Sequence, residues 1–257
     1  MNRRKFIYSS SLASLSVMGL NSCNIRNKDV KITILHTNDV HSQIEPFPFN
    51  HDKYPDRGGF ARRANIFKGL LKINPNTLIF DAGDIFQGTP YFNFFQGDLE
   101  LKLMKKMGYN AATIGNHEFD AGLNRLKKNI LNNNFQFISS NYDFTNTELE
   151  GLISKYKIYK KEGIKIGVFG LGIELNGLVN SSLYKETKYY DPVEITQEMT
   201  DILKNKENCD LIICISHLGH SYQNTKISDL KLGSLTSDID LIIGGHTHTF
   251  LKKPEII

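Results

Sequence analysis

Short apolar runs alternate with amphipathic stretches along most of the chain, beginning at Val30. The apolar, β-branched runs are typical of buried strands, whereas apolar residues three or four positions apart are typical of helices. The helical spacing is clear for Phe60, Ala64 and Phe67. The pattern predicts strands at 30–37, 77–81, 110–114, 135–140, 153–160, 165–170, 211–215 and 239–243, and helices at 59–71, 98–107, 121–132, 193–206 and 226–235. This alternation predicts an α/β domain with much of its sheet parallel.

The chain is long enough to bury one sizeable core. It has 257 residues, of which 40% are hydrophobic, and a chain of this length is expected to form about one or two domains. We expect a single domain at 30–257, preceded by a separate segment at 1–23 and a short polar tether at 24–29.

The segment at 1–23 has the composition of an export signal. Arg3, Arg4 and Lys5 precede a modestly apolar, Ser-rich run that leads to Cys23. The pattern resembles a bacterial twin-arginine signal that ends in a lipoprotein box, and the run is too short and too polar for a spanning helix. We therefore expect cleavage before Cys23, a lipid anchor on its thiol as the only membrane contact, and a periplasmic or cell-surface lipoprotein. A disordered tail that begins with two arginines is the alternative.

Charge and cysteine content argue against a nucleic-acid-binding protein and against a disulfide bond between Cys209 and Cys214. Without residues 1–23 the formal net charge falls from +4 to +1, because that segment holds three basic residues and no acidic ones. A near-neutral net charge argues against binding to a nucleic-acid polymer, which requires a concentrated basic face. Cys209 and Cys214 would lie about 16 Å apart along one extended strand, which is too far for a disulfide bond.

Polar residues that can bind metal ions follow directly on five of the predicted strands. The clearest case is Asp84, which comes after the apolar strand at 77–81 and lies between Gly83 and Gly88. In open α/β folds the carboxyl ends of the strands form the edge at which ligands bind. The same pattern gives seven candidate ligands: Asp39, His41, Asp84, Asn116, His217, His246 and His248. Seven donors are too many for one tetrahedral ion and suit two divalent ions that share one carboxylate.

The shared ligand is expected to be Asp84, because it combines a carboxylate with two nearby glycines. The remaining ligands then divide into Asp39, His41 and His248 for one ion and Asn116, His217 and His246 for the other. Two divalent ions about 3.5–4 Å apart can clamp a phosphoryl group and activate a water molecule for in-line attack. Zn, Mn, Co, Fe and Ca all stay open as the metal.

His117 is left over beside a predicted ligand, and Asp120 lies three residues further on. In an extended backbone His117 points away from the side on which Asn116 lies. The pair suits a cation or general acid opposite the ions, with Asp120 orienting the imidazole and favouring its charged form.

Four motifs, in this order, resemble those of the calcineurin-like metallophosphoesterases: Asp39-Val-His41, Gly83-Asp84-Ile-Phe-Gln-Gly88, Gly115-Asn-His-Glu118 and Gly245-His-Thr-His248. Longer strings at 36–41, 58–62, 115–120 and 216–220 resemble the branch that contains the 5′-nucleotidases and UDP-sugar hydrolases. The resemblance runs from Val30 to about Phe250, and an ordered series of this kind is specific.

The resemblance implies a two-layered β sandwich flanked by helices, the metallophosphatase fold, with residues 30–257 as the catalytic domain. It also implies two divalent metal ions as cofactors, His117 and Asp120 as the catalytic dyad, and hydrolysis of phosphomonoesters or pyrophosphates on nucleotides. The expected function is that of an exported di-metal phosphohydrolase of the 5′-nucleotidase type.

Two features depart from the family pattern. Some members carry an amide at the position of His248, which bears on metal preference. The chain ends at Ile257, where the family continues with further strands and usually a second domain that binds the base, so we expect truncated C-terminal strands and no substrate domain. The alternatives are a metallophosphatase or phosphodiesterase of broader specificity, and a catalytic half that needs a separate protein carrying the 5′-nucleotidase C-terminal domain.

Further polar residues lie close to these motifs. Asp81 ends its predicted strand three residues before Asp84, and we expect it to support that ligand rather than to bind metal. Arg62 and Arg63 begin a helix beside the site, where contact with phosphate and simple exposure are both open. His220 either supports His217 by a hydrogen bond or begins a surface helix.

Overall fold

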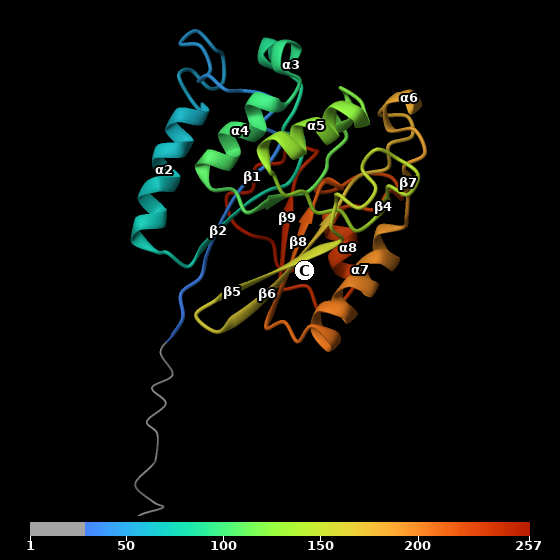
Figure 1. The fold of residues 1–257 in the computed structure, drawn as a ribbon. Coiled ribbons are helices and arrows are strands. Elements are labelled where there is room, and N and C mark those ends of the chain that lie inside the picture. The colour runs from blue at the N-terminus through green and yellow to red at the C-terminus, as the bar shows by residue number, and fades with distance from the viewer. Residues whose placement is uncertain (1–28) are drawn as a thin grey trace, which may run out of the picture. The chain divides into compact units, whose positions relative to one another are not determined.

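Two sheets lie face to face in the unit formed by residues 32–257 (Figure 1). The computed structural model describes residues 29–257, so the predicted signal at 1–23 and most of the predicted tether at 24–29 lie outside the described residues. The chain divides into residues 1–31 and residues 32–257, and every helix and strand of the described part belongs to the second unit.

The first sheet is parallel throughout and consists of β1 (Thr33–Thr37), β2 (Thr77–Asp81) and β3 (Ala111–Ala112), in that order. The second sheet has the order β5 (Tyr156–Lys161), β6 (Ile164–Leu171), β8 (Leu211–Ser216) and β9 (Leu241–Gly244). In it β5 and β6 form an antiparallel hairpin, while β6, β8 and β9 are parallel. A separate antiparallel pair joins β4 (Tyr142–Asp143) to β7 (Lys188–Tyr189).

The register keeps the carboxyl ends of the parallel strands level. Thr37 of β1 lies opposite Asp81 of β2, and Ser216 of β8 lies opposite Gly244 of β9. The loops that leave these strands therefore begin at one edge of each sheet.

An apolar layer fills the space between the sheets. Leu78 and Phe80 of β2 join Ile213 and Ile215 of β8 in this cluster. Ile79 points to the opposite side of β2, into a cluster with helix residues. A parallel strand covered on both faces has an almost continuous apolar sequence, and this is why 77–81 shows no alternation of polar and apolar residues.

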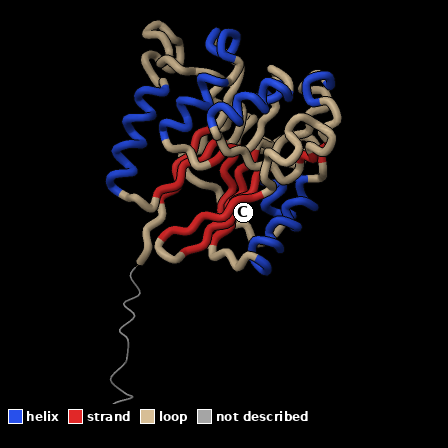
Figure 2. Tube along the Cα trace, viewed as in Figure 1, coloured by secondary structure: helices blue, strands red, loops and turns tan. Residues whose placement is uncertain are grey.

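Helices cover the outer face of each sheet (Figure 2). On the first sheet, α2 (Phe60–Ile73), α4 (Asp98–Met107) and α5 (Leu123–Asn133) contribute Phe67, Met104 and Leu126 to one apolar cluster. On the second, α7 (Pro192–Asp201) and α8 (Asp229–Leu235) contribute Met199 and Leu232 to another. The predicted fold class, an α/β fold with two layered sheets flanked by helices, is confirmed.

The shorter elements are α3 (Pro90–Phe95), the 3₁₀ turn η1 (His117–Phe119), α6 (Ser181–Tyr184) and the π-helical turn η2 (Ile202–Lys206). Within residues 29–257 no helix combines the length and the apolar content that crossing a membrane requires.

Two predicted strands are much shorter than expected. The stretch at 135–140 forms only isolated bridges, one from Phe137 to Ala112 and one from Ile138 to Ser154. The stretch at 110–114 pairs only over Ala111–Ala112. Phe137 and Ile138 are nevertheless buried, since an apolar residue can fill the core without belonging to a continuous ladder.

The predicted helix at 226–235 begins three residues late, at Asp229. The hydroxyl of Ser228 accepts a hydrogen bond from the amide of Lys231, which caps the first turn at that point.

Candidate metal centre

The predicted ligands follow the parallel strands of both sheets at their common edge. In three sets, one ligand atom from each member lies within 4.8 Å of the others: Asp39, His41 and His248; His41, Asp84 and His117; and Asp84, His217 and His246. Asn116 contacts the last set through its Oδ1, which lies 3.0 Å from Nδ1 of His246. The structure therefore brings all seven predicted ligands together.

Five of these residues have a left-handed backbone. The φ angle is 48° at Asp39, 43° at His41, 54° at Asp84, 71° at His246 and 50° at His248. Residues other than glycine rarely adopt this conformation, which persists only where surrounding contacts hold it. The amides of Asp39 and His41 donate to carbonyl groups of the loop after β2, which ties two of the loops together.

The fully buried side chain of His217 fits a metal ion. Its Nδ1 lies 2.6 Å from the carbonyl oxygen of Ala82 and donates to it, so Nε2 is the atom left to bind a cation. That Nε2 lies 3.0 Å from Oδ2 of Asp84, yet it makes no hydrogen bond of acceptable geometry. Buried polar atoms need a partner, and a cation that contacts both Nε2 of His217 and Oδ2 of Asp84 would satisfy both atoms.

A second group of donors converges on the side of Asp39. Nε2 of His41 lies 3.0 Å from Nε2 of His248, and the latter lies 3.6 Å from Oδ1 of Asp39. Nδ1 of His41 faces the carbonyl oxygen of Phe86 at 3.3 Å, which favours a proton on Nδ1 and leaves Nε2 free of one. Two imidazoles and a carboxylate are a donor set that zinc and other transition metals accept.

The electrostatics favour neutral imidazoles at His41 and His246 and a charged pair of Asp84 and His217. Burial lowers the pKa of His41, and burial together with the charge of His217 lowers the pKa of His246 to about 4. Burial acts to raise the pKa of Asp84, but the charge of His217 outweighs it and the pKa is lowered. For His217 burial lowers the pKa, and the charge of Asp84 raises it to about 9. A cation bound between these last two would displace that proton.

His117 and Asp120 form an ion pair at the border of this cluster. Nδ1 of the imidazole lies 2.7 Å from Oδ2 of Asp120, and the hydrogen bond that the imidazole donates to Asp120 is the main cause that raises the pKa of His117. The backbone amide of His117 donates to Oδ1 of Asp84 at 2.9 Å, and its ring lies 5.2 Å from that of His41. About a third of the side chain is exposed, so it can meet a molecule from solvent.

The sequence matches the calcineurin-like phosphoesterase family over residues 32–250, a range that includes both sheets and every clustered side chain. The chain belongs to this family.

Relatives of this phosphoesterase are named as nucleotidases. It is 34% identical to the 5′-nucleotidase of Vibrio cholerae in an alignment of 232 positions that covers 86% of this chain and 41% of that protein. The structure of a 5′-nucleotidase precursor from Thermus thermophilus matches with a TM-score of 0.78 and 32% identity, over 86% of this chain and 43% of that one. The NAD nucleotidase of Haemophilus influenzae matches with a TM-score of 0.75 and 32% identity, over 87% and 44%. This phosphoesterase thus spans less than half the length of these relatives.

Asp81 supports the loop that carries Asp84 and is in none of the ligand sets. Its side chain is completely buried, its Oδ1 accepts from the amide of Gly83 at 3.0 Å, and its Oδ2 accepts from the hydroxyl of Thr37. Burial raises the pKa of Asp81 to about 8. The carboxyl group is therefore protonated in the folded protein at neutral pH.

This buried acid predicts how stability depends on pH. Because its folded-state pKa exceeds the unfolded value, the folded chain binds the extra proton between about pH 4 and pH 8, and stability falls as pH rises through that window. We expect the midpoint of thermal unfolding to fall by several degrees between pH 6 and pH 9, and to fall less in Asp81→Asn, whose amide does not ionise. Parallel pH curves for the two proteins would contradict this.

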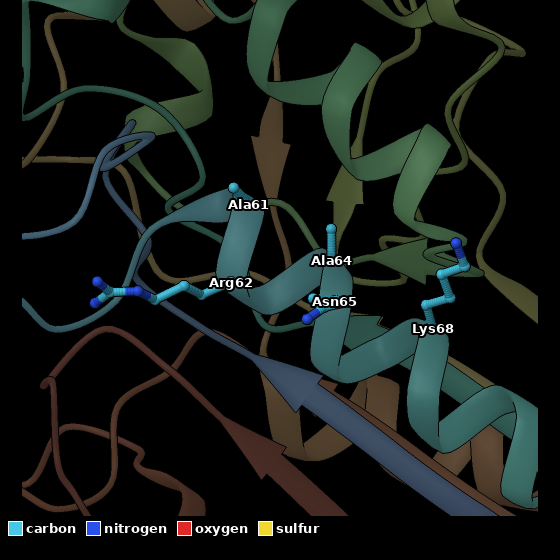
Figure 3. A pocket seen from close by; sticks show the side chains of 5 residues that line it. All are labelled: Ala61, Arg62, Ala64, Asn65 and Lys68. Carbon is cyan, nitrogen blue, oxygen red and sulfur yellow. The ribbon is translucent and has the colours of Figure 1, made fainter.

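The two arginines of α2 do not reach the ligands. Nη2 of Arg62 pairs with Oδ1 of Asp56 at 2.7 Å, while Arg63 lies over the ring of Phe60 and donates to the hydroxyl of Tyr109. A hollow on the exposed side of α2 is lined by Ala61, Arg62, Ala64, Asn65 and Lys68, and it contains none of the predicted ligands (Figure 3). Of the two interpretations left open, the structure favours exposure for Arg62, whereas Arg63 is half-buried against Phe60 and Tyr109.

His220 contacts the loop after β9 and not His217, a partner that the sequence left open. Its backbone amide donates to the hydroxyl of Thr247 at 2.9 Å, between His246 and His248, and its Nε2 lies 3.5 Å from Oε1 of Glu255. It therefore contacts the loop after β9 rather than His217.

The pattern of strands and ligands assigns no role to Glu118, although its carboxylate lies directly behind the cluster. Its oxygens accept hydrogen bonds from the amides of Asp84, Ile85 and Gly115. The available signal was its place at the end of the motif Gly115-Asn-His-Glu118, between His117 and the apolar Phe119.

Proposed function

We propose that this chain hydrolyses phosphate esters of nucleotides with two divalent metal ions, in the manner of a 5′-nucleotidase. The observation that carries the proposal is the buried pair of His217 and Asp84, which face each other without a hydrogen bond of acceptable geometry. Membership of a phosphoesterase family and similarity to proteins named as 5′-nucleotidases support the reaction class and the substrate class.

Seven side chains would hold the two ions, with Asp84 shared between them. Asp39, His41 and His248 would complete one site, and Asn116, His217 and His246 the other. When bound, the ions would supply positive charge for the phosphoryl oxygens and a water molecule of lowered pKa. The protein's own contribution is to hold these donors at fixed positions before substrate arrives, which the strained loop backbones support.

His117 would protonate the leaving oxygen of the ester. Asp120 accepts from its Nδ1, which leaves Nε2 as the atom that can carry a proton to substrate. The partial exposure of His117 at the border of the cluster supports contact with a bound ester. Asp120 would act by orienting the ring and by raising the pKa of His117, so that the acid form persists to higher pH.

Asp120→Asn is expected to move the alkaline limb of the kcat/KM profile to lower pH. The acid form of His117 is present below its pKa and lost above it, and removal of the carboxylate lowers that pKa. At pH 8 the kcat/KM of the variant should therefore be about tenfold or more below that of wild type, and at pH 6 the loss should be smaller. A pH profile of unchanged shape would show that Asp120 has another role.

The proposal is tested by hydrolysis of AMP, UDP-glucose and bis-p-nitrophenyl phosphate by the chain reconstituted with Mn²⁺ or Zn²⁺. We expect turnover of at least one nucleotide substrate, loss of it with a chelator, and its return when metal is added back. Turnover of the diester without either nucleotide would instead support the metallophosphatase or phosphodiesterase of broader specificity.

The second candidate is a catalytic half that acts with a separate substrate-binding protein. It is supported by the relatives, of which this chain covers less than half. Adding the purified C-terminal portion of such a relative should then raise nucleotide hydrolysis by the metal-loaded chain. Full activity of the chain by itself, unchanged by that addition, would remove this candidate.

We further propose that the protein is exported and carries a lipid on Cys23, on the strength of the sequence pattern at 1–23. In a bacterial host, labelled fatty acid should enter the wild-type protein but not Cys23→Ala. Replacement of Arg3 and Arg4 by lysine should retain the protein in the cytoplasm. Export of the doubly substituted chain would contradict the twin-arginine part of the proposal.

A further inference from the structure

The carboxylate of Glu118 is completely buried behind the ligand cluster, in the short turn η1. Its Oε2 accepts from the amides of Asp84 at 2.9 Å and Gly115 at 2.6 Å. Its Oε1 accepts from the amide of Ile85 at 2.7 Å and, more weakly, from that of Phe86 at 3.4 Å. One side chain thus binds backbone of the loop after β2 and of the loop after β3.

The loop after β2 is shaped to receive an anion. The backbone is left-handed at Gly83, with φ of 86°, and at Asp84, with φ of 54°. The turn directs the amides of Asp84, Ile85 and Phe86 toward one point, and successive amides in such a turn form a concave anion site. Here the carboxyl group of Glu118 occupies that site, and its two oxygens accept from these amides. Among residues 29–257, no lysine, arginine or histidine forms an ion pair with it, so the amides are its hydrogen-bonding partners.

We propose that Glu118 is a positioning residue for the metal centre, which sets Asp84 of one loop in a fixed relation to Asn116 and His117 of the other. The inference rests on the proposed function. By binding the amide of Asp84, Glu118 fixes the residue whose carboxylate faces His217 and accepts from the amide of His117. By binding the amide of Gly115, it fixes the residue directly before Asn116. Its own oxygens are occupied by amides, and it is in none of the ligand sets.

The two substitutions of Glu118 each keep one property of the side chain and remove another. In Glu118→Gln the volume is kept, but one oxygen becomes an NH₂ group that must face backbone amides, all of them donors. In Glu118→Asp the charge is kept, but the carboxylate is one methylene shorter and cannot reach both loops at once. Glu100→Gln is a matched control, because Glu100 in α4 is also completely buried and its oxygens receive no hydrogen bond of acceptable geometry.

The test is the affinity of the full chain for Mn²⁺, measured by calorimetry after metal removal, together with kcat at saturating Mn²⁺ and the unfolding midpoint. Relative to wild type, we expect Glu118→Gln to bind Mn²⁺ about tenfold to a hundredfold more weakly and to have a lower kcat. Glu118→Asp should lie between the two. Glu100→Gln should keep the wild-type affinity whatever its unfolding midpoint, which separates positioning from general stability.

If Glu118→Gln binds Mn²⁺ as wild type does, this inference is overturned while the proposed function stands. If wild type itself binds neither Mn²⁺ nor Zn²⁺, the proposed function fails and the inference with it. If Glu118→Gln does not fold, amide exchange in metal-free wild type replaces it: the amides of Asp84 and Gly115 should exchange at least about a hundredfold more slowly than exposed loop amides, and rapid exchange would overturn the inference.

Discussion

His117→Ala is expected to lower kcat by about 10²–10⁴-fold and to leave Mn²⁺ bound. The imidazole is paired with Asp120 through Nδ1 and is partly exposed, so it is placed to act on a bound ester. The seven remaining donors do not depend on its side chain, since Asp84 accepts from its backbone amide, which alanine keeps. Steady-state hydrolysis of AMP and metal analysis of the same sample would measure both effects.

The matched control for this variant is His51→Ala. His51 lies in the loop before α2, where its ring accepts from the amides of Lys53 and Tyr54. Activity and metal content should equal those of wild type. If His117→Ala lost metal together with activity, His117 would be a ligand, as its place in the set with His41 and Asp84 allows.

Gly115→Ala is expected to weaken Mn²⁺ binding by about tenfold or more and to lower kcat/KM by about a hundredfold or more. A Cβ at this position would lie 2.6 Å from the amide nitrogen of Asp84 and 2.8 Å from Nε2 of His217, and it would also collide with the Asp84 carboxylate. These neighbours are backbone and buried side chains, so they can yield only by moving the predicted shared ligand and its partner.

Gly69→Ala is the control for this substitution. Gly69 lies inside α2, and an added Cβ would meet nothing within 4 Å. Alanine should leave activity unchanged and stabilise the helix by about 0.5–1 kcal/mol. Normal Mn²⁺ affinity in Gly115→Ala would show that the loops after β2 and β3 can separate without cost, and it would argue against a preformed centre.

The seven candidate ligands could be predicted from sequence, because each follows a predicted strand. Asp84 and His217 are far apart in the chain, but β2 and β8 both end at one edge, so an apolar strand followed by a donor was enough to associate them. The fold class followed from the same alternation of strands and helices. The roles of the individual residues stay predictions, which the substitutions above are designed to test.

Other features depend on contacts that a linear pattern does not contain. The stretch at 135–140 has the apolar content of a strand but pairs only through isolated bridges. The pair β4 and β7 has only two residues in each strand, and its partners are far apart in sequence. The left-handed backbone at Asp39 and His41 is held by hydrogen bonds from their amides to the loop after β2, and these contacts cannot be read from the local sequence.

Anomalous diffraction from crystals grown with Mn²⁺ would locate the ions directly. We expect two peaks, one bounded by Asp39, His41 and His248, the other by Asn116, His217 and His246, with Asp84 contacting both. A single peak, or peaks that lie away from Asp84, would contradict a centre built on a shared carboxylate.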